Sequence, residues 1–121
     1  MNEEEKKEKL FEDGIKFFKS KEYFEAHESW EDLWSDYYLE DKKFIQGLIQ
    51  LSVSFVHMGN GNLIGAKSLL NKANDKFQLY NGIQRGINIK KLLGQIKIIA
   101  QAYDDLNNPT DFDWELVPNL E

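Results

Sequence analysis

The chain has the spacing of apolar residues that is typical of helices. Apolar side chains recur at intervals of three and four residues, and no segment sustains the two-residue alternation of a half-buried strand. We therefore expect an all-α protein, with helices over residues 3–19, 22–38, 41–58, 62–80 and 88–106. Clusters of glycine and asparagine after the third and fourth of these segments predict loops.

The predicted architecture is a five-helix bundle, made of two tetratricopeptide-like helix hairpins, a closing C-terminal helix and a packed irregular tail. The first hairpin is indicated by small and apolar residues with tetratricopeptide offsets, namely Gly14, Phe17, Ala26, Trp30 and Leu33. A weaker second match falls at Ser54, His57, Ala66, Leu70 and Ala73. We expect one domain over residues 1–121, with its core in about 10–106 and the tail in 107–121.

Composition narrows the possible functions. None of the 121 residues is cysteine, which excludes thiol catalysis, cysteine-based zinc fingers and iron–sulfur ligation. The net charge is −6 and Arg85 is the only arginine, so we expect no nucleic-acid binding, which needs clustered basic residues. The acidic N-terminus lacks the pattern of a secretory signal, and we expect a cytoplasmic protein. Residues 44–66 carry no charged side chain, but polar residues and glycines interrupt them, so we expect a buried helix and a turn there and no membrane span.

His27 and Glu31 are the main candidates for a functional site. On a helical wheel of residues 22–38, His27 falls near the middle of the apolar half and Glu31, one turn on, falls at its edge. A histidine and a glutamate at this spacing converge, as two ligands of a divalent metal do. A metal site needs at least a third ligand, which Glu28 or His57 could supply. Glu28 lies away from His27 on the wheel.

The helix predicted over residues 41–58 carries a polar stripe on an otherwise apolar surface. Gln46, Gln50 and His57 lie within about 40° of one another on its wheel. His57 lies about 16 Å along the axis from Gln46, so only one end of the stripe can meet the His–Glu pair of the preceding helix. Glutamines are common buried hydrogen-bond partners, so they would orient that pair. Together with Trp34, Gln46 and Gln50 are the expected binding residues.

The same residues have a structural interpretation. A buried histidine paired with a glutamate and neighbouring glutamine amides forms a satisfied polar network that fixes helix packing. His57 alone would bond the C-terminal end of its helix. The aromatic residues of segment 22–38 are more typical of a core than of a cofactor site. No nucleotide-binding, zincin or serine-hydrolase motif is present.

Four parts of the sequence together resemble the domain of unknown function family 309 of bacteria and archaea. They are YFEAHESWEDLW at residues 23–34, QGLIQ at 46–50, His57, and GNLIGAKSLL at 61–70. The resemblance implies a small, all-helical cytoplasmic protein, and the family is sometimes labelled a predicted metal-dependent hydrolase. Its pattern carries over to Glu25, His27, Glu28, Trp30, Glu31, Trp34, Gln46, Gly47, Gln50, His57, Asn62, Gly65 and Ala66. Where the family is expected to have a basic residue, usually arginine, before the third-helix motif, this chain has Lys42-Lys43.

Three functional hypotheses remain open. In the first, His27, Glu31 and a third ligand, Glu28 or His57, bind a divalent metal, a metal-bound water attacks a small substrate of unknown identity, and the Glu28 or Glu31 carboxylate moves the proton. In the second, the helix hairpins bind a protein partner or form a homodimer. In the third, a cleft between the second and third helices binds a small ligand.

The acidic surplus is confined to the first third of the chain. Residues 1–40 hold 13 acidic and 6 basic residues, whereas residues 41–121 hold 8 acidic and 9 basic residues. Between Glu22 and Asp41 there are eight acidic residues and no lysine or arginine. This segment predicts an acidic helix that either attracts a cation or a basic partner, or forms an ordinary solvated face.

Overall fold

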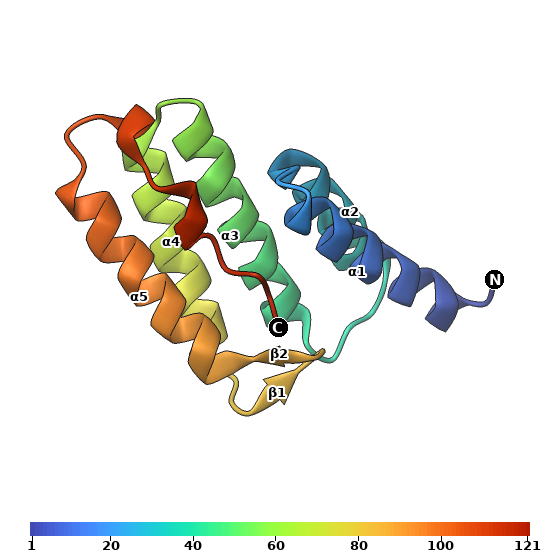
Figure 1. Ribbon diagram of the computed structural model, residues 1–121. Coiled ribbons are helices and arrows are strands. Elements are labelled where there is room, and N and C mark those ends of the chain that lie inside the picture. Colours follow the sequence, from blue (N-terminus) through green and yellow to red (C-terminus); the bar gives the residue numbers. More distant parts are fainter.

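The computed structural model describes residues 1–121 and consists mainly of five α-helices (Figure 1). The helices are α1 (Glu3–Lys19), α2 (Tyr23–Asp36), α3 (Lys42–Gly59), α4 (Leu63–Phe77) and α5 (Ile89–Asp105). Two short strands, β1 (Ile83–Gln84) and β2 (Ile87–Asn88), precede α5, and two single-turn 3₁₀ helices, η1 (Pro109–Asp111) and η2 (Trp114–Leu116), follow it. The all-α fold class predicted from the periodicity is confirmed.

The helices are arranged as two hairpins and a closing helix. The first hairpin consists of α1 and α2 and the second of α3 and α4; α2 packs on α3, and α5 packs on α4 (Figure 1). One cluster of 25 buried hydrophobic residues includes members of all five helices, β2 and the C-terminal tail. The tail therefore packs on the bundle, as its aromatic residues predict. None of the helices combines the length and the apolar character that a membrane crossing requires.

Small residues permit close approach within each hairpin. A β-carbon built on Gly14 would come within 2.6 Å of the Trp30 indole, and one built on Gly47 would come within 2.8 Å of the Phe77 ring. The second hairpin is also joined by a polar contact, because the Ser54 hydroxyl donates a hydrogen bond of 2.7 Å to the carbonyl oxygen of Ala66. Any side chain larger than hydrogen at either glycine would separate the paired helices.

Two predicted helices are too long at their C-terminal ends. The prediction for the second helix extends to residue 38, but α2 ends at Asp36 and Tyr37 has extended backbone angles of φ −135° and ψ 155°. The fourth helix was expected to reach residue 80, but α4 ends at Phe77. Tyr80 instead accepts a hydrogen bond of 3.1 Å from the backbone N–H of Phe44. This bond ties the segment that follows α4 to the start of α3.

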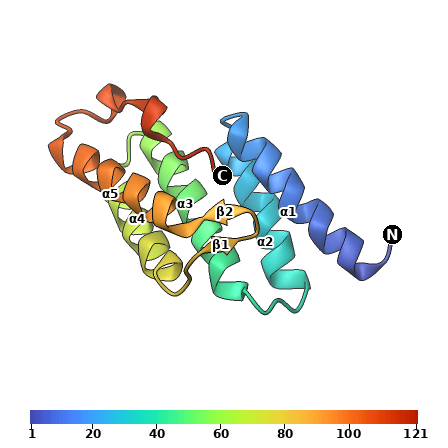
Figure 2. The same cartoon turned by 60° about the horizontal axis from the view of Figure 1, so that its bottom comes forward.

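The segment expected to be only a loop contains a β-hairpin. Its two strands pair Ile83 with Asn88 and Gln84 with Ile87. Arg85 and Gly86, the two turn residues, have φ values of 49° and 80°, the left-handed pair that a tight two-residue hairpin requires. The turn reaches from α5 toward α1 and α2 (Figure 2), so that this hairpin ties the two ends of the bundle together.

Candidate functional site

The structure brings His27 and Glu31 together on α2. The His27 Nδ1 lies 2.9 Å from the carbonyl oxygen of Phe24, and because a carbonyl only accepts, Nδ1 is the nitrogen that carries the proton. The His27 Nε2 lies 3.0 Å from Glu31 Oε2. The ring is thus held at one nitrogen by the backbone, while the other faces a carboxylate that is more than half exposed. This pair lies at the surface of α2 and is not a dry buried network.

His57 belongs to a different part of the molecule. Its Nδ1 lies 3.3 Å from the side-chain nitrogen of Asn62, whose Oδ1 accepts the backbone N–H of Gly65 at 2.9 Å and so caps α4. A β-carbon built on Gly65 would come within 2.9 Å of the His57 ring, which shows how tightly the three residues pack. His57 therefore supports the start of α4.

The glutamine stripe of α3 also lies on the side toward α4. At 100° per residue, Gln50 is about 140° from Phe55, whose ring contacts Tyr23 of α2, and only about 60° from Gly47, which contacts α4. Gln46 lies about 180° from Phe55 on the same wheel. The Gln50 Oε1 atom is buried without a protein hydrogen-bond partner. The structure thus does not bring Gln46 or Gln50 to the His–Glu pair of α2.

The other two predicted site residues lie on α2. Glu28 is exposed and makes no ion pair or side-chain hydrogen bond. Trp34 is partly buried, and the Lys42 ammonium lies 4.4 Å from its ring centroid. The Trp34 Nε1 atom is buried without a protein partner. No hydrogen bond or ion pair joins the side chain of Glu28 or Trp34 to the His–Glu pair.

The positions of His27, Glu31, Glu28 and His57 do not assemble the predicted metal site. No group of three or more His, Asp or Glu side chains in the structure is placed to hold a metal ion. His27 and Glu31 supply two converging donors, and a catalytic metal centre ordinarily has three protein ligands. The residues present therefore do not fit a complete metal centre built by this chain alone.

An apolar groove of about 620 Å³ lies beside the His–Glu pair. Its aromatic residues come from three elements: Tyr23 and Phe24 from α2, Phe55 from α3, and Trp114 from η2. The Tyr23 ring stacks on Trp114 with centroids 5.9 Å apart and contacts Phe55 at 5.3 Å. Burial raises the pKa of the Tyr23 phenol, as expected for a ring that forms part of an apolar floor.

Phe24 connects the groove with the His–Glu pair. Its side chain is 52% exposed, whereas Tyr23 and Trp30 of the same helix are buried. The ring centroids of Phe24 and His27 are 5.2 Å apart, and the carbonyl of the same Phe24 holds His27 Nδ1. An exposed aromatic ring at the edge of the groove and the Glu31 carboxylate thus lie about two turns apart on α2, with His27 between them.

The exposed side of α2 is strongly acidic. None of its six exposed carboxylates forms an ion pair with a lysine or arginine in the structure; Glu31 lies against His27, and Asp36 accepts a hydrogen bond of 3.2 Å from the Ser35 hydroxyl. The acidic residues are Glu22, Glu25, Glu28, Glu31, Asp32 and Asp36. Glu22 and Glu25 line the groove itself, and Lys21 is the one basic residue at its edge.

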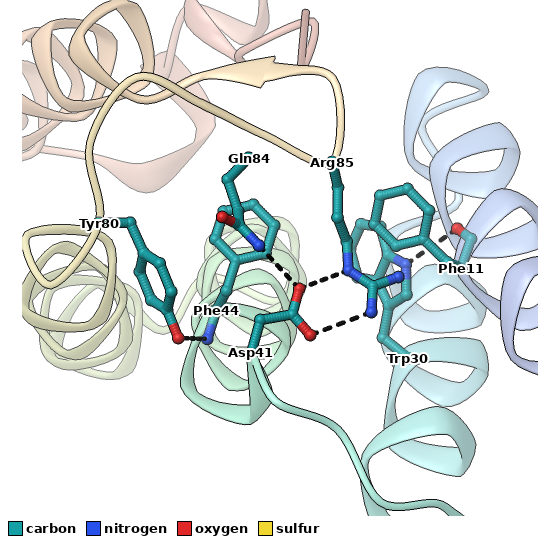
Figure 3. Close-up of polar contacts among 7 residues, drawn as sticks. All are labelled: Phe11, Trp30, Asp41, Phe44, Tyr80, Gln84 and Arg85. Carbon is teal, nitrogen blue, oxygen red and sulfur yellow. Dashed lines mark hydrogen bonds and ion pairs between the residues drawn. The ribbon is translucent and has the colours of Figure 1, made fainter.

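A second polar cluster, which the sequence analysis did not predict, surrounds Arg85 (Figure 3). The guanidinium forms a forked contact with Asp41, through Nε to Oδ2 and through Nη2 to Oδ1 at 3.0 Å, and Gln84 donates a bond of 3.0 Å to the same carboxylate. The Arg85 guanidinium also lies 4.8 Å from the Phe11 ring centroid. Burial alone would raise the pKa of the Asp41 carboxyl, but the Arg85 and Gln84 contacts lower it overall.

The comparisons with known proteins identify the family. The model of the family described as "Domain of unknown function (DUF309)" matches residues 11–69. This segment of the chain belongs to DUF309. Searches of curated proteins and of solved structures find no match.

The DUF309 match covers most of the two helix hairpins. It begins at Phe11 in α1 and ends at Leu69 in α4, so it includes the His–Glu pair and the α2 and α3 sides of the groove. Trp114, which completes the groove, and Arg85, which clamps the β-hairpin, lie outside the matched segment. The DUF309 hairpins thus form most of the groove, and the C-terminal region closes it.

Proposed function

We propose that this protein is a helical interaction module that binds an apolar segment of another protein in the groove between α2, α3 and η2. The observation that carries the proposal is the groove itself, with its aromatic floor and the exposed Phe24 ring at its edge. A volume of about 620 Å³ accommodates one or two large apolar side chains, and helical hairpins commonly present such surfaces to peptide segments.

The contacts within the two helix hairpins support this function. In α1–α2, a β-carbon on Gly14 would meet the Trp30 indole, and in α3–α4 the Ser54 hydroxyl bonds the Ala66 carbonyl. All four residues belong to the set with tetratricopeptide offsets. Tetratricopeptide-like hairpins stack to create extended binding surfaces, because each hairpin cannot bury its apolar face alone. The groove lies at the junction of the two hairpins, which is the place where such stacking leaves a surface.

A segment of a different protein fits the groove better than a second copy of this chain does. In a two-fold dimer each copy presents the same patch to the other, so the groove of one copy would face the groove of its partner. Glu22 and Glu25 line that patch and the rest of the acidic face of α2 adjoins it. Such an arrangement would oppose like charges across the contact, which weakens association.

The proposal is tested by selecting peptides from a random display library on the wild-type protein. Val56 lines the groove and is only partly buried, so Val56→Lys places a charge in the groove, and thermal unfolding verifies that the variant keeps the fold. Ile64→Lys is the matched control, because Ile64 is 84% exposed and lies outside the groove. Enriched apolar peptides are expected to lose about tenfold or more in affinity with Val56→Lys and to bind Ile64→Lys normally. Failure to enrich any peptide, or equal binding to both variants, would contradict the proposal.

A metal-dependent hydrolase is the second candidate, and one observation favours it. Anchoring of His27 Nδ1 by a carbonyl oxygen is the arrangement that orients a metal-binding histidine, and it directs Nε2 toward Glu31. With two protein donors, a cation there would need its remaining ligands from a bound molecule or from water. Titration of the purified protein with zinc or manganese tests this: a stoichiometric site that raises the melting temperature and is lost in His27→Ala supports it, and no binding removes it.

A further inference from the structure

The acidic face of α2 adds a second requirement to the groove. We infer that the bound segment carries lysine or arginine next to its apolar anchor, and that Glu28 and Glu31 bind this basic side chain while the groove takes the anchor. The inference rests on the proposed function of the groove and names the chemistry of its partner. The volume of the groove does not determine the charge of its ligand, but the charge of the surrounding surface does.

The geometry places a carboxylate beside the anchor position. Glu28 follows Phe24 by one turn on the same side of α2. The Glu31 Oε2 atom lies 3.0 Å from His27 Nε2, and the His27 ring centroid lies 5.2 Å from that of Phe24. When the imidazole carries a proton on both nitrogens, Nδ1 donates to the Phe24 carbonyl and Nε2 donates to Glu31, so that the carboxylate is oriented before any partner arrives. A preorganised carboxylate binds a guanidinium or ammonium with less loss of side-chain freedom.

The charges around the groove also give the bound segment a direction. Lys21 and Glu22, of opposite charge, lie at the edge of the groove near the start of α2, whereas Glu25, Glu28 and Glu31 continue along the helix with no basic residue among them. None of these carboxylates has a lysine or arginine partner within the chain, so their charge is available to a ligand. The basic residues of the segment therefore lie on the side that leads along α2 toward Glu31 and away from Lys21.

The test uses two fluorescein-labelled peptides with the same leucine and phenylalanine anchors, one flanked by arginines and the other by glutamines. Fluorescence anisotropy measures the affinity of each peptide for wild-type protein, Glu28→Gln, Glu31→Gln and the groove variant Phe24→Ala. Asp75→Asn is the matched control, because Asp75 is an exposed acidic residue of α4 without an ion pair. Thermal unfolding of each variant verifies that the fold is retained.

The arginine peptide is expected to bind about tenfold more tightly than the glutamine peptide at low salt, and added salt should reduce that preference. Glu28→Gln and Glu31→Gln should reduce the preference, and Asp75→Asn should leave it unchanged. Equal affinities of the two peptides, with both weakened by Phe24→Ala, would overturn the basic partner and leave the groove function standing. Binding of neither peptide, or binding that Phe24→Ala does not weaken, would overturn both.

Discussion

The indole of Trp30 lies directly on Gly14, so that the side chain of α2 occupies the space where α1 would otherwise carry a β-carbon. Trp30 is fully buried, and its Nε1 donates a hydrogen bond of 3.1 Å to the carbonyl oxygen of Phe11. This contact sets the distance between the helices of the first hairpin. It thereby positions the N-terminal end of α2, which forms one wall of the groove.

Gly14→Ala is expected to destabilise the protein by about 1–3 kcal/mol, because the added methyl group overlaps a buried indole that has no room to move. Gly94→Ala is the matched control, since nothing lies within 4 Å of a β-carbon at that position of α5. It should stabilise by about 0.5–1 kcal/mol through helix propensity. Urea denaturation measures both changes, and a loss of stability in both variants would contradict this view of the hairpin.

Arg85→Gln is expected to destabilise the fold by about 1.5–3 kcal/mol, because it removes a charged hydrogen-bond partner from the largely buried Asp41. The contacts lower the pKa of Asp41 from its ordinary 3.8 in the folded state, so their stabilisation is present above pH 3.8 and is lost as pH falls through the lower, folded value. The difference in unfolding free energy between wild type and variant should therefore shrink in acid. A difference that stays constant as the pH is lowered would contradict the role of this ion pair.

For Tyr103 we expect a loss of stability at high pH, in contrast to the loss in acid expected for Asp41. Burial, only partly offset by the bond to Ser54, raises the pKa of Tyr103 to about 12 from an ordinary value of 10.0. Between these two values the unfolded chain has lost the phenolic proton and the folded chain retains it, so stability falls as pH rises. Tyr103→Phe should flatten this decline, and Tyr23, whose pKa burial also raises, accounts for part of what remains. Denaturation curves at several alkaline pH values measure the slope; an unchanged slope would count against the burial of Tyr103.

Asn62→Ala should cost about 0.5–2 kcal/mol through loss of the cap at the start of α4. Asn88→Ala removes a similar cap from α5, where Asn88 accepts the backbone N–H of Lys91 at 3.1 Å. The first substitution should cost more, because Asn62 also contacts His57 at 3.3 Å. Thermal unfolding of the two variants compares them directly, and a larger loss in Asn88→Ala would argue against the structural role assigned to His57.

The helices could be predicted from the sequence because long amphipathic segments repeat the same spacing over several turns. The β-hairpin could not, because two residues per strand are too few to show alternation around Arg85 and Gly86. The contact between Arg85 and Asp41 joins residues 44 positions apart, and no local pattern predicts such a pairing. The sequence shows only that the chain has a single arginine. Which residue it pairs with depends on the fold.

The candidate site was predictable only in part. The spacing of His27 and Glu31 within one helix predicted their contact, since helix geometry alone determines it. The wheel of α3 placed His57 on a polar stripe, but it could not show that His57 contacts Asn62 at the start of α4, because a wheel carries no information on neighbouring helices. The groove depends on Trp114 of the tail, whose position follows from tertiary packing.

The most direct test of the central claim is an NMR titration of the ¹⁵N-labelled protein with the arginine-flanked apolar peptide. Binding in the groove should shift the amide signals of Tyr23, Phe24 and Val56 and the indole N–H of Trp114, and leave the signals around Arg85 unchanged. The absence of shifts at these positions, or shifts centred on the Arg85 cluster, would contradict the proposal that this groove binds a partner segment.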